Sequence, residues 1–404
     1  MSSNPINCSF CGRAKEEVDV LIAGVTGHIC DNCIEQADNI LQEERKEVPE
    51  TANFELKLPK EIKAHLDEYV IGQEEAKRTI SVGVYNHFKR IVHPTPEDGV
   101  EIDKSNVILL GETGTGKTLI ARTIAKMLDV PFCIADATVL TEAGYVGEDV
   151  ESVLSRLLQN ADFDVERTER GIVFIDEIDK IARKSDNASI TRDVSGEGVQ
   201  QALLKLLEGA EVNVPPQGGR KHPEQKLITI NTKNILFVCG GAFSGIEKII
   251  ERRIKRSSIG YQQEVAHVKE ASYLEYAAHA DLKSFGLIPE LIGRFPVLTY
   301  LKPLDAAALR RILTEPKNAL CKQYIQLFAI DGIELKFEAS GLDYLVEKAV
   351  DYKLGARGLR SIMEAVLNEA MYEMPGGEEK KLVINRKFAE SRFTGDKNSG
   401  LRVA

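Results

Sequence analysis

The amino-acid sequence predicts an α/β fold in three parts: a large domain on a parallel sheet, a smaller mostly helical domain, and an N-terminal module held by cysteines. In the middle of the chain, short apolar runs alternate with helical periodicity, which is typical of parallel strands covered by helices. After Lys302 and Pro303 longer helical stretches replace this alternation. Two Cys-x-x-Cys pairs lie near the N-terminus.

Four short apolar runs are the expected strands of the large sheet. These candidate strands span residues 106–110, 131–135, 171–175 and 235–239. In the smaller domain we expect helices over residues 304–328, 340–350 and 359–374, with weaker strand signals over 333–337 and 381–384. Helical and strand periods differ enough for these patterns to be separated.

The predicted domain boundaries follow changes in composition. The cysteine module covers residues 1–48, and a polar linker covers 49–64. The large α/β domain covers 65–302, the small helical domain covers 303–394, and a polar tail over 395–404 is expected to be disordered.

Composition restricts the functional class. The 404 residues carry a formal net charge of −10, which argues against a dedicated nucleic-acid partner, because phosphate neutralisation needs clustered Lys and Arg. The sequence has no apolar run long enough to span a membrane, so we expect neither a membrane span nor a membrane partner. The first residues lack the features of a signal peptide, and the cysteine count of seven is odd, so we expect a reducing cytoplasm.

A glycine-rich loop lies between a predicted strand and a predicted helix. It fits the phosphate-loop pattern G-x-x-x-x-G-K-[ST] in the required context. Its backbone N–H groups would surround phosphate oxygens, Lys117 would neutralise the β- and γ-phosphates, and Thr118 would ligate Mg²⁺. The expected ATP-binding residues here are Glu112, Thr113, Gly114, Thr115, Gly116, Lys117, Thr118 and Leu119.

Two carboxylates end the candidate strand over residues 171–175. Asp176 would hold Mg²⁺, largely through water, and Glu177 would orient and deprotonate the attacking water. A buried strand that delivers two acids beyond a phosphate loop indicates ATP hydrolysis.

Four cysteines have the spacing of a zinc module. Cys8, Cys11, Cys30 and Cys33 fit C-x₂-C-x₁₈-C-x₂-C, and four thiolates close a tetrahedral Zn²⁺ site with no open position. The zinc would therefore be structural, and it would supply the stability that so small a core lacks. A DNA-binding finger is the alternative, but the segment is not notably basic.

Longer motifs resemble the ClpX family of AAA+ protein unfoldases, from the cysteine pairs to about Met374. The segments that carry the resemblance span residues 69–73, 144–149, 192–200, 216–222, 287–294 and 355–360. The resemblance implies an AAA+ P-loop ATPase that forms a homohexamer. Such a ring recognises tagged or misfolded proteins, with the help of adaptors, and feeds them through its axial pore to the ClpP peptidase.

The resemblance also implies residue roles. Tyr145 and Val146 would grip substrate in one pore loop, and residues 191–200, which include Arg192, would form a second. Arg220, Lys221 and His222 would form a basic pore entrance, which could attract a substrate's C-terminal carboxylate.

The resemblance implies that two arginines take part in ATP hydrolysis. Arg294 matches the arginine finger donated to the neighbouring subunit, and Arg357 matches the second sensor arginine. Val70 and Ile71 would pack against adenine, with plain core packing as the alternative. Residues 239–241 offer no Asn or Thr for the first sensor, so that role stays unassigned.

The sequence departs from the family pattern at two places. Glu112 stands where the family usually has Pro in the phosphate loop, and we expect nucleotide binding to survive because this side chain can point outward. The nearest match to the family's peptidase-docking tripeptide Ile-Gly-Phe is Ile259-Gly260-Tyr261, with Tyr in the place of Phe.

Three alternative functions fit the sequence less well. A related AAA+ motor of the HslU type lacks the four-cysteine module. A helicase would need a basic channel. A zinc-dependent scaffold that only senses ATP would be expected to lack Glu177 or Arg294, and both are present.

Overall fold

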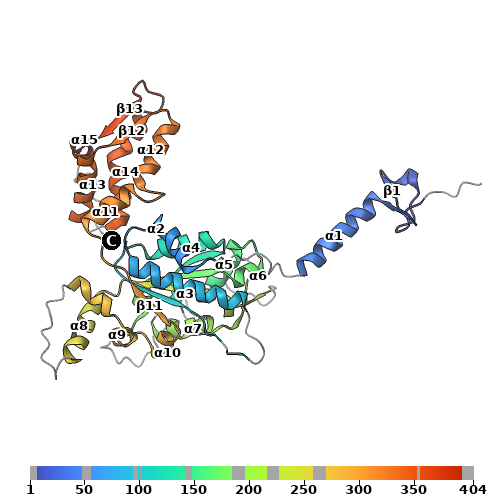
Figure 1. Cartoon of the computed structure of the whole chain (residues 1–404), viewed down its shortest axis with the longest axis horizontal. Coiled ribbons are helices and arrows are strands. Elements are labelled where there is room, and N and C mark those ends of the chain that lie inside the picture. The colour runs from blue at the N-terminus through green and yellow to red at the C-terminus, as the bar shows by residue number, and fades with distance from the viewer. Residues whose placement is uncertain are drawn as a thin grey trace, which may run out of the picture. The chain divides into compact units, whose positions relative to one another are not determined.

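The computed structural model describes residues 7–47, 56–93, 99–100, 102–141, 148–183, 196–215, 227–257, 270–352 and 355–393. The chain forms two compact units, Met1–Glu55 and Leu56–Ala404 (Figure 1).

The N-terminal unit is small. A turn of 3-10 helix (Lys15–Glu17) precedes an antiparallel pair of short strands, β1 (Leu21–Ala23) and β2 (His28–Cys30), and helix α1 (Asp31–Glu47) follows directly. Because β2 ends at Cys30 and α1 begins at the next residue, Cys33 lies in the first turn of the helix.

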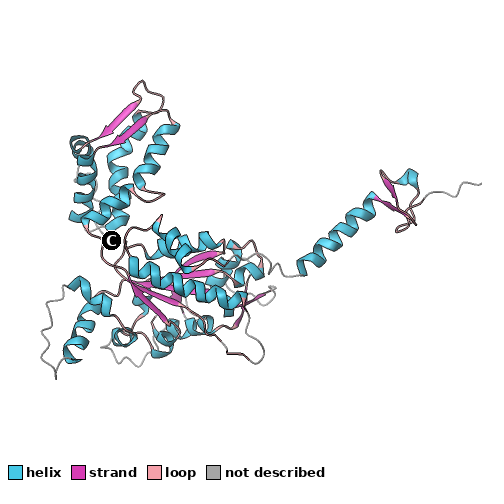
Figure 2. Ribbon diagram, viewed as in Figure 1, coloured by secondary structure: helices cyan, strands magenta, loops and turns pink. Residues whose placement is uncertain are grey.

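The larger unit contains the predicted parallel sheet (Figure 2). Its five strands are all parallel and lie in the order β11 (Val297–Tyr300), β3 (Val107–Leu110), β10 (Leu236–Gly241), β7 (Ile172–Asp176) and β4 (Phe132–Asp136). Strands β3, β10 and most of β7 are buried, as their near-continuous apolar sequences require. The four predicted strands are therefore confirmed, and β11 is a fifth strand that the sequence pattern did not predict.

Helices and short strands surround this sheet. They are α3 (Glu74–Val92), α4 (Lys117–Leu128), α5 (Ser152–Asn160), α6 (Val165–Glu169), α7 (Glu197–Glu208), α8 (Ile246–Ser257), α9 (His279–Phe285) and α10 (Pro289–Gly293), with the strand pairs β5 (Leu140–Thr141) and β6 (Glu148–Asp149), and β8 (Glu211–Val214) and β9 (Ile228–Asn231). Buried apolar residues from Ile108 to Phe295 form one core among them.

The C-terminal part has a second core, formed by residues from Leu309 to Phe393. Its elements are α11 (Ala306–Thr314), α12 (Leu320–Ile330), α13 (Ala339–Asp351), α14 (Gly355–Glu373), α15 (Arg386–Arg392), and the parallel strands β12 (Glu334–Phe337) and β13 (Lys381–Ile384). The single helix predicted over 304–328 is wrong: two helices occupy this stretch. Pro316 lacks the N–H that a continuous helix needs and stands where α11 has ended.

The predicted linker is too long at its C-terminal end. Helix α2 (Pro59–Asp67) begins within the range 49–64 that was expected to be linker. Pro59 occupies the first turn, where its missing N–H costs nothing, and the Leu58 N–H donates to the Glu61 carboxylate at 2.7 Å. Ile62 and Leu66, four residues apart, are both buried, so this polar-looking segment packs as an amphipathic helix.

Among the described residues, no helix is long and apolar enough to span a lipid bilayer.

Candidate nucleotide site and metal centre

The phosphate loop lies between β3 and α4, as predicted. Gly114 and Gly116 have φ angles of 83° and 107°, in the left-handed region that favours glycine. Gly114 also lies close to the small domain, because a Cβ there would be 3.6 Å from the backbone nitrogen of Ala356. The N-termini of α4 and α14 therefore both lie at this loop, and helix N-termini favour bound anions.

Lys117 is largely buried beneath the loop. Its Nζ donates to the carbonyl oxygens of Gly111 at 2.5 Å and Glu112 at 2.9 Å. Burial lowers the pKa of Lys117, while the nearby carboxylates of Asp176 and Asp179 oppose this change. The ammonium is thus held in place by backbone acceptors, which suits a cation that binds phosphate.

Thr118 and Asp176 approach each other from different elements. The Thr118 hydroxyl lies 3.3 Å from Asp176 Oδ2, although these two residues, on α4 and β7, are separated by fifty-eight positions in sequence. The Glu177 N–H donates to Asp176 Oδ1 at 3.0 Å, and Glu177 itself has a left-handed φ of 57°. A hydroxyl beside a carboxylate is an oxygen donor set that fits Mg²⁺.

A cavity with a volume of 540 Å³ opens over these groups. Both domains line it. The large domain contributes Tyr69, Thr113, Gly114, Gly116, Lys117, Thr118, Leu119, Asp176, Glu177, Asp179, Lys180, Ala242 and Ser244, and the small domain contributes Ile312, Pro316, Asn318, Leu320, Ala356, Arg357 and Arg360. Arg357 thus lies where the resemblance implied, in a helix of the small domain that faces the phosphate loop.

Sequence reasoning missed several of these lining residues. Tyr69 lines the cavity, whereas its neighbours Val70 and Ile71 are buried, so their contact with adenine stays a prediction. Arg360 lies one helical turn beyond Arg357 on α14, and i, i+3 spacing could have found it. Asp179 accepts the N–H of Ala242 at 3.0 Å, which joins the turn after β7 to the end of β10.

Arg294 does not line this cavity. It directly follows α10, and its guanidinium forms an ion pair with Glu208 at the end of α7, with 2.6 Å between Nη2 and Oε1. Both side chains are about half exposed. The arginine is therefore accessible for a contact outside its own nucleotide site.

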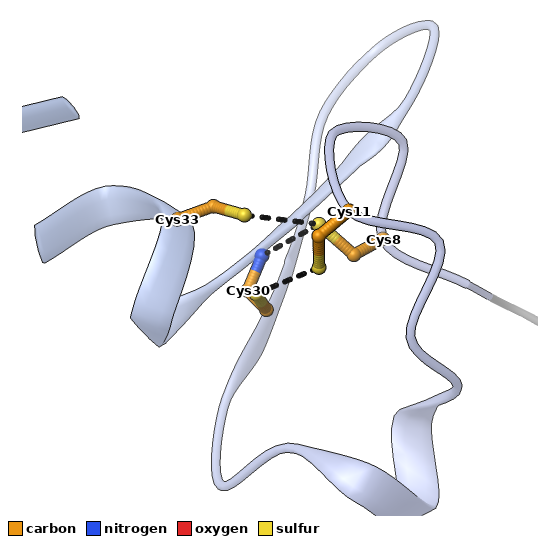
Figure 3. Close-up of side chains that lie close together, drawn as sticks. All are labelled: Cys8, Cys11, Cys30 and Cys33. Carbon is orange, nitrogen blue, oxygen red and sulfur yellow. Dashed lines mark hydrogen bonds between the residues drawn. The ribbon is translucent and has the colours of Figure 1, made fainter. Parts of the chain in front are cut away.

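The four predicted metal ligands converge in the N-terminal unit (Figure 3). Their Sγ atoms all lie within 4.8 Å of one another, with 3.9 Å between Cys8 and Cys33 and 3.6 Å between Cys11 and Cys30. Four sulfurs at these separations fit a tetrahedral Zn²⁺ ion with no open position.

Backbone groups tune these thiols. The N–H of Cys11 is the main cause that lowers the pKa of Cys8 to about 6, and the Cys30 N–H also donates to Cys8 Sγ, at 3.3 Å. Burial and the three neighbouring sulfurs raise the pKa of Cys33 to about 12. Four thiolates therefore need a cation to coexist. Cys133 and Cys239 are buried in the sheet, as expected.

Some predicted site residues lie outside the described part of the chain. These are Tyr145, Val146, Arg192, Arg220, Lys221, His222, Ile259, Gly260 and Tyr261. Residues 395–404 also lie outside it.

Comparisons with known proteins agree with this geometry. Residues 6–43 match the ClpX C4-type zinc finger, residues 102–298 match an AAA domain of the Cdc48 subfamily, and residues 304–382 match the C-terminal D2-small domain of ClpB protein. A protein of Bacteroides thetaiotaomicron, named "ATP-dependent Clp protease ATP-binding subunit ClpX", is 60% identical over 98% of both chains. This chain belongs to the ClpX family.

Other relatives of the same name support this membership. Those of Porphyromonas gingivalis and Bacteroides fragilis are each 60% identical, over 96% and 97% of this chain and 96% of their own. As a ClpX-family member with an AAA domain, the chain is an ATPase of α/β AAA+ fold that uses ATP, Mg²⁺ and Zn²⁺. The HslU-type motor and the ATP-sensing scaffold are not favoured.

Proposed function

We propose that this chain is an ATP-driven protein unfoldase. It assembles as a homohexamer, threads tagged or misfolded proteins and proteins brought by adaptors through its axial pore, and delivers them to the ClpP peptidase. It works in the cytoplasm, where a reducing environment keeps its thiols available for zinc, and neither nucleic acid nor membrane is a partner.

The observation that carries this proposal is the composite nucleotide cavity. Catalytic groups of the large domain face Arg357 and Arg360 of the small domain across one space, so bound nucleotide would contact both. A change in that nucleotide would therefore act on the relation between the two domains, which is the movement a motor needs.

Residues around the cavity would carry out ATP hydrolysis. Lys117 and the loop N–H groups would bind the β- and γ-phosphates, and Thr118 and Asp176 would hold Mg²⁺, which neutralises charge on the phosphates when bound. Glu177 would orient the attacking water and take its proton. Arg357 would report the state of the γ-phosphate to the small domain.

The position of Arg294 supports assembly into a ring. This arginine lies outside the cavity of its own subunit, and we propose that it completes the site of a neighbour, in exchange for its ion pair with Glu208. Hydrolysis would then depend on assembly.

A reconstituted degradation assay tests the proposal. The purified chain is mixed with ATP, Mg²⁺, the ClpP peptidase of the relatives and a stably folded protein that carries a C-terminal tag. We expect peptides to accumulate only when all components are present. ATP hydrolysis without any loss of the folded substrate would favour the scaffold instead.

A further inference from the structure

Gln73 occupies an unusual backbone position. It precedes α3 with φ 58° and ψ 36°, in the left-handed region, and is only 8% exposed. A long side chain is uncommon in this conformation, where glycine or Asn is preferred. The requirement for glutamine must therefore come from its side chain.

The side-chain amide of Gln73 pairs with a single distant residue. Its Nε2 donates to the carbonyl oxygen of Lys302, and its Oε1 accepts the N–H of Lys302, both at 2.8 Å. The amide thus satisfies both backbone groups of Lys302, as a neighbouring strand would. Two short hydrogen bonds to one residue fix its position as well as its orientation.

Lys302 lies in the connection between the two domains. This connection runs from the end of β11 at Tyr300 to the start of α11 at Ala306. The preceding residue, Leu301, donates its N–H to Leu110 at 2.7 Å, directly before the phosphate loop. Any change in the angle between the domains must alter the backbone of this connection.

The residues that precede Gln73 in the chain connect it to the nucleotide cavity. Tyr69 lines that cavity, and the short segment 68–72 joins it to Gln73. Lys77, only 2% exposed, braces this segment: its Nζ donates to the Val70 carbonyl oxygen at 3.3 Å and pairs with Asp67 and Glu74 at 2.5 and 3.0 Å.

The same segment also contacts the small domain. The Lys317 N–H donates to the Glu68 carbonyl oxygen at 2.8 Å, and the Lys317 ammonium lies 5.9 Å from the centre of the Tyr69 ring. The segment 68–72 is therefore linked both to the interdomain connection and to the domain that must move.

We propose that Gln73 is a positioning residue that transmits nucleotide occupancy from the segment 68–72 to the interdomain connection at Lys302. This role rests on the proposed nucleotide site. The Gln73 amide is buried and makes two hydrogen bonds to Lys302, so it has little freedom to move independently of that residue. A displacement of the segment 68–72 on nucleotide binding therefore moves Lys302 as well.

Two substitutions separate this role from simple stabilisation. Gln73→Glu keeps the length and can still accept the Lys302 N–H, but a carboxylate then faces the Lys302 carbonyl oxygen. Gln73→Asn keeps the amide and suits a left-handed backbone, but it is one carbon shorter and cannot reach both groups. Gln159→Glu, an exposed glutamine at the end of α5, is the matched control.

The experiment uses the full-length chain and follows hydrogen exchange at the Lys302 amide with and without ADP and Mg²⁺. In the wild type and the control, we expect nucleotide to slow this exchange. In Gln73→Asn, we expect exchange to be faster by about tenfold and insensitive to nucleotide, since roughly one net hydrogen bond is lost. In Gln73→Glu, the amide keeps its acceptor, but its response to nucleotide is lost.

Turnover provides the second readout. We expect the KM for ATP to stay within about threefold in both variants, while the ATP consumed per substrate unfolded rises by about tenfold, again the value of one hydrogen bond. Wild-type nucleotide response and coupling in both variants would overturn the proposal. So would a parallel loss of ATP affinity, thermal stability and coupling, which indicates a merely structural role. Failure of the wild type itself to bind ATP would contradict the proposed nucleotide site, on which the role of Gln73 rests.

Discussion

Arg294 and Glu208 form an ion pair that joins the end of α10 to the end of α7, with 2.6 Å between the guanidinium and the carboxylate. Helix α7 begins at Glu197, within residues 191–200, which the resemblance implied to be a second pore loop, so the pair lies at the opposite end of that helix. Both partners of this ion pair are about half exposed, so the contact is weak enough for Arg294 to exchange it for another.

Arg294→Ala is expected to suppress ATP hydrolysis in the assembled ring by about 10³-fold, since the guanidinium would no longer stabilise the charge on the transferred phosphoryl group. Nucleotide affinity should change much less, because Arg294 lies outside the cavity of its own subunit. Steady-state ATPase and nucleotide titration check both effects. Mixed rings with Glu177→Gln subunits should regain activity at interfaces where an intact Arg294 faces an intact Glu177, and no regain would contradict donation in trans.

Glu177→Gln should leave ATP binding intact and lower turnover by at least about 100-fold, the range expected for removal of a general base. Lys117, Thr118 and Asp176 remain to hold the nucleotide and its Mg²⁺. Equilibrium binding and single-turnover hydrolysis measure the two effects separately. Turnover close to that of the wild type would remove Glu177 from its role in activating water.

Cys30→Ser should release zinc and unfold the N-terminal unit while sparing basal ATPase activity. The motif residues of the motor all lie in the separate unit Leu56–Ala404, and a serine hydroxyl is a poor replacement for a thiolate ligand. Metal analysis and the ATPase rate are the measurements, with Cys133→Ser as a control that leaves the metal site intact. One zinc per chain retained by Cys30→Ser would contradict the four-cysteine site.

Tyr145→Ala should uncouple hydrolysis from mechanical work. We expect ATP consumption to continue, because this residue is outside the nucleotide motifs, while grip on a stable substrate weakens. The ratio of ATP hydrolysed to substrate unfolded should rise. An unchanged ratio with a stably folded tagged substrate would argue against a pore role.

The tripeptide Ile259-Gly260-Tyr261 is expected to dock the peptidase. Each apolar side chain buried at an interface contributes about 1.5–3 kcal/mol, and six copies per ring multiply a weak contact by avidity. Ile259→Ala or Tyr261→Ala should therefore reduce peptidase binding and degradation, with ATP hydrolysis and unfolding unchanged. Tyr261→Phe is the conservative control and should bind as well or better. Full degradation by the double alanine variant would show that the loop does not dock.

Local patterns were enough to predict the main elements and the metal site. The phosphate loop, the strand that ends at Asp176 and the four cysteines each follow from short-range spacing, and the structure brings them together as expected. The edge strand β11 was missed because only Thr299 of its four residues is buried, so it lacks the continuous apolar run of a central strand such as β3. Pro316 was present in the sequence and should have divided the helix predicted over 304–328.

Tertiary relationships could not be predicted in the same way. Tyr69 and Arg360 meet at one cavity only because the two domains fold against each other, and no local pattern encodes that contact. The pairing of Gln73 with Lys302 joins positions separated by 229 residues. The ion pair between Arg294 and Glu208 is likewise invisible from either motif alone.

The most direct test of the proposed motor is to follow the unfolding of a tagged fluorescent protein without any peptidase. With ATP and Mg²⁺, the wild-type chain should abolish the substrate's fluorescence at a rate that depends on hydrolysis, and Glu177→Gln should bind the substrate but leave it folded. Loss of fluorescence that proceeds equally with the Glu177→Gln variant, or none with the hydrolysing wild type, would contradict an ATP-driven unfoldase.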